Sequence, residues 1–388
     1  MNYDFDRVID RRNTNSLKWN VGDHELPMWV ADMDFRTAPE IISAIQKIAA
    51  HGVFGYSEVP DEWYESYTAW WKKRHGLEME KEKLIFCTGV IPAISSLVRK
   101  LTTPAEKILI QTPVYNIFFN SILNNGRQVL EAPLVYFDGH YTVDWNDLEK
   151  KLSDPQTTLM ILCNPHNPIG RIWDKDTLSR IGELCCKNHV TVISDEIHCD
   201  LTSPSKSYIP FASVSDVCRN ISITFIAPTK TFNIAGIQTA AVYAPNPRLY
   251  NKAFRCLNTD EVAEPNAFSV DAAVAAFSKS GNWLDSLRNY IYENKPIAEK
   301  YFRENIPQIT LISSDATYLL WIDCSRISDD TSKLTNFIRS ETGLYISSGK
   351  QYGECGKKFI RVNIACPKLL LLEGLEKLAV GIRKYPER

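Results

Sequence analysis

Seven short runs of apolar and β-branched residues lie between residues 84 and 245, and stretches with helical periodicity separate them. Several runs are apolar on both faces, as strands in a sheet that is covered on both sides require. Alternation of such strands with helices is typical of βαβ units. The sequence therefore predicts an α/β fold with a mostly parallel seven-stranded sheet flanked by helices. The expected strands are residues 84–87, 107–111, 127–131, 158–163, 190–195, 221–226 and 238–243.

The pattern changes after about residue 280, where a long helix is expected over residues 283–305. Strands near 318–323 and 359–364 then alternate with helices near 332–341 and 368–384. Residues 1–40 have the character of an extended arm, and a helix is expected after Pro39. A chain of 388 residues is long enough for two domains. We expect a large α/β domain over residues 42–280 and a smaller α+β domain in which residues 1–41 join residues 281–388.

The overall charge and the cysteines exclude several classes of protein. The net charge of −2 gives no basic excess for nucleic acid or an anionic membrane. No apolar run approaches the ~18 residues of a spanning helix, and the charged N-terminus does not fit a signal peptide. The ten cysteines are scattered, without the spacing of a disulfide framework or a zinc site. We expect a cytoplasmic protein with reduced thiols, no metal, and neither nucleic acid nor membrane as partner.

Two charged residues stand where predicted strands end. Asp195 closes the run 190–195, and Lys230 follows the run 221–226. Alone, each is more often a helix cap or a surface residue. The carboxyl ends of strands in an open α/β sheet are, however, where ligands bind. Pyridoxal phosphate requires this pair, because a lysine attaches to its aldehyde and a carboxylate keeps its ring nitrogen protonated. We therefore expect this cofactor, with Lys230 as nucleophile and base.

Further strand ends carry residues that fit the same cofactor. Asn167 lies in a turn with two Asn-Pro steps, and from there it could donate to the ring oxygen. Gly89, Val90 and Ile91 begin a helix whose free N–H groups suit a phosphate, although a plain tight turn fits equally well. Tyr115 follows another strand and either packs in the core or stacks on the ring.

Arg361 is embedded in the apolar run 359–364. An unpaired charge there would be costly, so the guanidinium needs an anionic partner. A substrate α-carboxylate held bidentately is one candidate, and a structural Asp or Glu is the other.

Taken together and in this order, these motifs resemble the pyridoxal-phosphate enzymes of the aspartate-aminotransferase fold, fold type I. The similarity covers nearly the whole chain. Within that fold, the chain most resembles the cystathionine β-lyase-like C–S lyases, the group that includes cystalysin. The matching stretches are residues 16–19, 30–35, 54–56, 163–173 and 230–236.

The resemblance implies a role for each motif. Lys230, Asp195 and Tyr115 would be catalytic: Lys230 would hold the cofactor, Asp195 its ring nitrogen, and Tyr115 would stack on its ring. Asn167 would contact the ring hydroxyl, with His198 nearby, although a lone histidine is more often structural.

The cofactor phosphate and the substrate have their own implied partners. The phosphate would meet Gly89, Val90, Ile91 and Thr229, and also Tyr56 of the partner subunit, which implies a homodimer with shared active sites. Arg361 would take the substrate carboxylate, helped by Asn167 and by the backbone around Ala31.

Two positions in the sequence differ from the patterns of the related enzymes, and both bear on the expected activity. Gln238 stands where many aminotransferases of this fold have an arginine eight residues after the lysine, which favours the lyase branch. Residues 349–353 are more polar than the corresponding loop of the lyases, so the preferred substrate side chain stays open. The expected reaction is β-elimination from L-cystathionine, L-cysteine or L-cystine to pyruvate, ammonia and a thiol.

Two alternatives stay open. One is an aminotransferase, which would need a keto acid as acceptor. The other is a pyridoxal-phosphate-binding regulatory protein that acts through partners. The intact set of Lys230, Asp195, Asn167 and Arg361 argues against a loss of catalysis.

Overall fold

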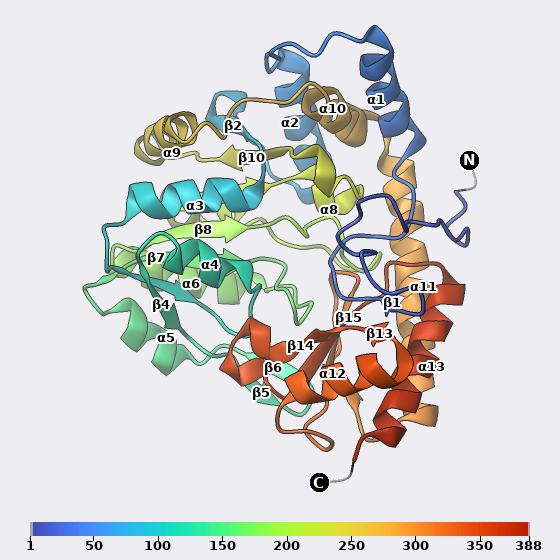
Figure 1. Cartoon of the computed structure of the whole chain (residues 1–388). Coiled ribbons are helices and arrows are strands. Elements are labelled where there is room, and N and C mark those ends of the chain that lie inside the picture. The colour runs from blue at the N-terminus through green and yellow to red at the C-terminus, as the bar shows by residue number, and fades with distance from the viewer. Residues whose placement is uncertain (1–2, 387–388) are drawn as a thin grey trace.

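The computed structural model describes residues 3–386. Residues 1–2 and 387–388, which belong to the expected small domain, lie outside the described range. A seven-stranded sheet forms the centre of the molecule (Figure 1). Six strands run parallel, and β10 is antiparallel to both its neighbours. In spatial order the strands are β2 Leu84–Cys87, β10 Ala240–Tyr243, β9 Ser222–Ile226, β8 Thr191–Asp195, β7 Thr157–Cys163, β3 Lys107–Ile110 and β4 Gln128–Glu131.

Helices cover both faces of this sheet, which explains why its strands are apolar on both sides. One face packs against α3 (Val90–Leu101), α4 (Ile117–Leu123) and α9 (Pro247–Thr259). The other face packs against α5 (Trp145–Leu152), α6 (Lys175–Lys187) and α7 (Asp216–Ile221). Near β2 and β10 that second face meets an aromatic-rich cluster from α1 (Pro39–His51), α2 (Asp61–His75) and α10 (Ser269–Lys279).

Helix ends follow local capping chemistry. The Asp174 side chain accepts a hydrogen bond from the Thr177 N–H and begins α6, and Asn246 does the same for Arg248 at the start of α9. Helices α1 and α2 stop at Gly52 and Gly76, whose φ values of 76° and 66° are left-handed.

A four-stranded sheet and three helices form the second part of the fold. Its strands, in order, are β11 Thr310–Leu311, β12 Leu319–Asp323, β15 Phe359–Asn363 and β14 Ser347–Ser348. The helices are α11 (Gly281–Asn305), α12 (Thr331–Thr342) and α13 (Lys368–Lys384). The N-terminal arm, dark blue in Figure 1, lies against this part, because β1 (Leu26–Pro27) pairs with β13 (Leu344–Tyr345).

The remaining elements are short. A hairpin is formed by β5 (Val135–Phe137) and β6 (His140–Thr142), and the helix that carries Lys230 is α8 (Pro228–Thr231). Single 3₁₀ turns occur at Lys81–Lys83, Phe211–Ser213, Ala235–Ile237, Gly349–Tyr352 and Glu354–Gly356.

The predicted fold class is confirmed, and each of the seven expected strands is present to within two residues at either end. Between residues 3 and 386, no helix has the length and apolar character needed to cross a bilayer. All ten cysteines are free thiols, and eight of them are buried. The structure thus matches the expectation of mostly internal thiols.

Candidate active site

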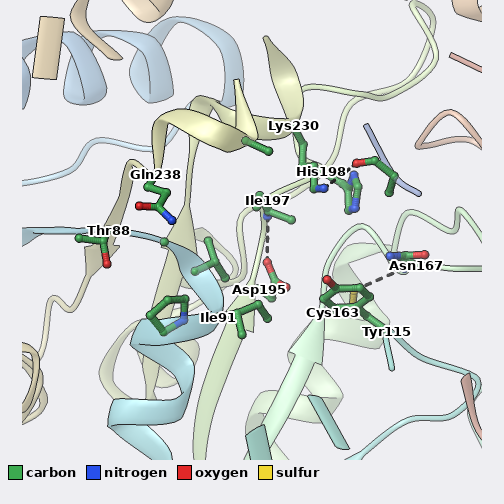
Figure 2. Close-up of a pocket in the computed structure, with 15 residues that line it drawn as sticks. Thr88, Ile91, Tyr115, Cys163, Asn167, Asp195, Ile197, His198, Lys230 and Gln238 are labelled. Atoms are coloured by element: carbon green, nitrogen blue, oxygen red, sulfur yellow. Dashed lines mark hydrogen bonds between the residues drawn. The ribbon is translucent and has the colours of Figure 1, made fainter. Parts of the chain in front are cut away.

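Strand register brings the predicted site residues to one edge of the large sheet. Cys163, Asp195 and Phe225 lie side by side on β7, β8 and β9, so the segments that follow these strands leave from the same edge. A cavity of about 250 Å³ opens there (Figure 2). Nine predicted residues line it: Ala31, Gly89, Val90, Ile91, Tyr115, Asn167, Asp195, His198 and Lys230.

Lys230 projects into the cavity from α8. Its Nζ donates to the backbone oxygen of Ala31 at 2.6 Å. Burial lowers the pKa of Lys230 to about 8; the negative charge of Asp32 opposes this shift, and the positive charge of Arg361 adds to it. A lysine with this pKa is neutral for a useful fraction of the time near neutral pH, as a base or nucleophile must be.

Asp195 is 4% exposed, and one of its oxygens accepts a hydrogen bond from the Ile197 N–H at 3.1 Å. Burial raises the pKa of Asp195 to about 7, against the effects of the Ile197 bond and of Lys230. Within residues 3–386 it forms no ion pair. A buried carboxylate without a cation is costly, so its environment fits a positively charged partner such as a protonated pyridine nitrogen.

The other end of the cavity is built from the start of α3. Gly89 precedes the helix, and no side chain caps its first turn. Val90 and Ile91 in this first turn line the cavity, and uncapped N–H groups at a helix start suit an anion such as a phosphate. Figure 2 shows Thr88 and Gln238 at this end, so the neighbouring side chains are neutral hydrogen-bonding groups.

Asn167, His198 and Tyr115 lie toward the opposite end in Figure 2. The Asn167 N–H donates to Cys163 Sγ at 3.4 Å, which ties the predicted turn to the end of β7. His198 is buried and its Nδ1 has no hydrogen-bond partner. Burial lowers the pKa of His198 to about 3, so the ring is a neutral hydrogen-bonding group. These polar atoms suit the ring substituents of a heterocycle.

Arg361 is 5% exposed on β15; it does not line the cavity itself but contacts Asn167, which does. Its Nη2 donates to the Trp29 oxygen at 2.9 Å, and its Nη1 contacts Asn167 Oδ1 at 3.4 Å. The guanidinium stacks over the Tyr352 ring at 4.8 Å, and its Nε has no partner. The structural Asp or Glu that the sequence allowed is not found within residues 3–386. The spare donor therefore fits a carboxylate ligand.

Two predicted phosphate contacts lie outside the cavity wall of this chain. Thr229 is buried, 8% exposed, and does not line the cavity. Tyr56 is fully exposed in a loop after α1, beside the exposed Phe54. Their assigned roles stay predictions.

Sequence reasoning missed the residues that hold the N-terminal arm over the lysine. Asn233 receives the Met33 N–H on its Oδ1 and donates to the Met33 and Phe35 oxygens, all between 2.8 and 2.9 Å. Tyr318 donates to the same Ala31 oxygen as Lys230, at 3.0 Å. A polar residue three positions after the lysine was the only local signal for this clamp.

Comparison with known families decides the relationship. The family described as aminotransferase class I and II matches residues 25–378. The chain belongs to this family. The predicted family is therefore confirmed, and the site described above is the pocket of a family member.

The relatives are similar over their full lengths. Cystathionine beta-lyase PatB of Bacillus subtilis is 40% identical, with 97% of this chain and 99% of the relative covered. Protein MalY of Escherichia coli is 31% identical, with 98% and 99% covered.

Solved structures of family members agree with the fold and the cofactor. Cystalysin from Treponema denticola, which contains pyridoxal 5′-phosphate, superposes with a TM-score of 0.96 at 33% identity over the whole of both chains. A pyridoxal-phosphate-bound C–S lyase from Staphylococcus hominis gives 0.92 at 32% identity, with 98% of this chain and 99% of that chain covered. The fold type and the cofactor class expected from Lys230 and Asp195 are confirmed.

Proposed function

We propose that this protein is a pyridoxal-phosphate-dependent C–S β-lyase that converts sulfur-containing L-amino acids, such as L-cystathionine, L-cysteine or L-cystine, to pyruvate, ammonia and a thiol. The observation that carries the proposal is a set of three charges: Asp195 and the partly buried Lys230 line the cavity, and the buried Arg361 contacts Asn167, which also lines it. Asp195, Lys230 and Arg361 each lack an oppositely charged side chain within hydrogen-bonding distance in the described chain. Full-length similarity to proteins named cystathionine beta-lyase and C–S lyase supports the same activity.

The residues present fit the cofactor at both of its ends. Asp195 would hold the ring nitrogen, Asn167 and His198 the ring substituents, and the first N–H groups of α3 the phosphate. When bound, pyridoxal phosphate supplies a ring that takes up the negative charge developing on the substrate α-carbon. Asp195 keeps the ring nitrogen protonated, because its carboxylate is favoured as soon as a positive charge lies beside it.

Lys230 moves the protons. As a neutral amine it takes the substrate α-proton, and its pKa of about 8 keeps a fraction of the amine neutral near pH 7. The ammonium that results is stabilised by the Ala31 oxygen, which Lys230 already contacts at 2.6 Å. The same proton is then available to the departing sulfur. Proton transfer by a positioned group contributes about 10²–10⁴-fold to the rate.

Arg361 and the arm orient the substrate. Arg361 holds the α-carboxylate, with Asn167 and the Ala31 backbone completing that end of the pocket. The arm closes over the lysine from the side of the small sheet. The site is therefore divided between residues 42–280 and the unit that joins residues 1–41 to residues 281–388, and we treat these as the two domains.

A homodimer completes the proposal. Val53, Phe54 and Tyr56 are all more than half exposed on one loop, which suits a protein contact better than solvent. In this arrangement Tyr56 of the partner subunit reaches the phosphate end of the cavity. A cytoplasmic location is proposed from the free cysteines.

The test uses purified protein with a panel of sulfur amino acids and no added keto acid. A lyase releases pyruvate and a thiol in equal amounts, and Lys230→Ala abolishes both. Turnover that appears only when a keto acid is added would identify an aminotransferase instead. Negligible turnover together with cofactor-dependent capture of a protein partner would identify a regulatory protein.

A further inference from the structure

Lys230 lies on helix α8, which is too short to keep its orientation without contacts from other elements. Helix α8 has only four residues, far fewer than an isolated helix needs for stability. Its orientation must therefore come from contacts made by its neighbours. Thr231, the residue after the lysine, is fully buried, and its Oγ1 donates to Asp200 Oδ2 at 3.1 Å. Asp200 lies five residues after Asp195, in the segment that follows β8.

Asp200 is held from its other side by α2. Trp70 Nε1 donates to Asp200 Oδ1 and Oδ2 at 3.0 and 3.2 Å, and His75 Nε2 lies 2.9 Å from Oδ1. The carboxylate is 3% exposed. Burial acts to raise the pKa of Asp200, but the contacts with His75 and Trp70 outweigh it and lower the pKa. Asp200 is thus an ionised acceptor with donors from two separate elements, an arrangement with strong and directional hydrogen bonds.

Helix α2 is a rigid base for this contact. Trp63, Tyr67 and Trp71 are fully buried in the aromatic cluster beside β2 and β10. The Trp70 ring also packs edge-on against Phe232, two residues after the lysine, at 5.8 Å between centroids. Both residues that follow Lys230 therefore rest on the same rigid surface, one through Asp200 and the other through the Trp70 ring.

We propose that Asp200 is a positioning residue for Lys230, acting through the Thr231 hydroxyl, with Trp70 and His75 fixing its carboxylate. This inference rests on the proposed function, in which Lys230 moves the substrate proton. Asp200 does not line the cavity and touches neither the cofactor position nor the substrate position. Its effect is on geometry: it keeps the Lys230 amine in the position in which Nζ donates to the Ala31 oxygen. A misplacement of about 1 Å at such a group lowers a rate by as much as ~100-fold.

The experiment compares Asp200→Asn and Thr231→Val with Thr231→Ser in cofactor-loaded protein. Thr231→Ser keeps the hydroxyl, while Thr231→Val removes it at nearly constant volume. The matched control is Thr335→Val, because Thr335 is a buried threonine of α12 whose Oγ1 bonds only to backbone oxygens. The readouts are kcat, KM and the pH midpoint of the absorbance of the bound cofactor.

We expect Asp200→Asn and Thr231→Val each to lower kcat by about 10- to 100-fold with KM nearly unchanged, and to shift the pH midpoint of the cofactor absorbance. Thr231→Ser and Thr335→Val should resemble the wild type in all three. The double variant should be no worse than the poorer single variant, because both changes disrupt the same Thr231–Asp200 hydrogen bond. If Asp200→Asn does not fold, Thr231→Val alone decides.

Additive losses, or a lower melting temperature with an unmoved pH midpoint and normal kcat, would reduce Asp200 to a structural residue and overturn the inference. Wild-type protein that binds no cofactor would instead refute the proposed function itself. The two failures are therefore separable in one set of measurements.

Discussion

Asp195 and Arg361 are charged side chains in the interior, and Lys230 is a partly buried charge beside them. Burial shifts the pKa of Asp195 up to about 7 and the pKa of Lys230 down to about 8, in both cases toward the neutral form. Each pKa shift corresponds to a decrease in the stability of the folded state that applies when the group is charged. A ligand that restores partners to these groups binds only the folded state, and so it should stabilise the protein against unfolding.

Replacing Lys230 with Met should stabilise the cofactor-free protein at pH 7. The folded pKa of about 8 lies below the ordinary value of 10.5, so the unfolded chain binds more protons between these limits and the wild type gains stability as pH rises through them. At pH 7 the full penalty applies, and its removal should add about 1–3 kcal/mol to the free energy of unfolding. Urea unfolding at pH 7 and pH 10.5 measures this. The gain should shrink at the higher pH, and the exposed Lys47→Met should show no gain; a destabilised Lys230→Met would contradict the interpretation.

Arg361→Lys should weaken substrate binding while leaving cofactor binding intact. Lysine keeps the charge but loses the planar pair of donors that matches a carboxylate. Loss of a charge-assisted hydrogen bond removes about 1.5–3 kcal/mol, which corresponds to roughly a tenfold or larger increase in KM. Steady-state kinetics measure the change, and the unaltered cofactor absorbance is the control. An unchanged KM would place the substrate carboxylate elsewhere.

At the scale of elements, the start of α3 is the part of the site that would bind its ligand through backbone N–H groups rather than through side chains. An aspartate at Ile91 would place its own anion at the N–H groups that the phosphate needs. Ile91→Asp should therefore weaken cofactor affinity by about 1 kcal/mol or more relative to the neutral Ile91→Asn. Cofactor titration followed by absorbance measures both variants. Equal affinities would show that the phosphate is held by other groups.

The elements were largely predictable because their signals are local. A run such as residues 84–87 is apolar and bounded by turns, and β2 occupies those residues. Helix α13 likewise begins and ends as its apolar periodicity indicates. The antiparallel direction of β10 was not specified, since strand composition does not encode direction and the short connection through α8 decides it.

Site residues were predictable where they end a strand, and not where they depend on distant partners. Lys230 and Asp195 follow buried runs, so their positions were visible in the sequence. The contact of Lys230 with the Ala31 oxygen joins residues 199 positions apart, and no local pattern names such a partner. The role of Asp200 was not predicted for the same reason, because two of its partners, Trp70 and His75, lie on α2, well over a hundred positions earlier.

At the scale of the whole molecule, the site joins three separate parts of the chain: the N-terminal arm, the edge of the large sheet and β15. The arm is fixed to the lysine loop by Asn233, and β1 pairs it with β13 of the C-terminal part. A change in how the arm packs would therefore alter both Lys230 and the substrate end of the pocket. The proposed homodimer would add a fourth part through Tyr56.

Mixing two inactive variants tests that dimer. In a hybrid of Lys230→Ala and Tyr56→Ala subunits, one site has both defects and the other has both native residues. Random reassociation should restore up to about one quarter of wild-type activity, because half of the dimers are hybrids with one intact site. Activity assays before and after mixing measure the recovery. Absence of recovery, with hybrids demonstrated by mass, would place Tyr56 outside its partner's site.

The central claim is that the Lys230 amine carries the cofactor. Treating the cofactor-loaded protein with borohydride fixes that bond, and peptide mapping by mass spectrometry then locates it. We expect a single modified peptide containing Lys230, with loss of the modification in Lys230→Ala. Modification at another lysine, or none in protein supplied with pyridoxal phosphate, would contradict the account.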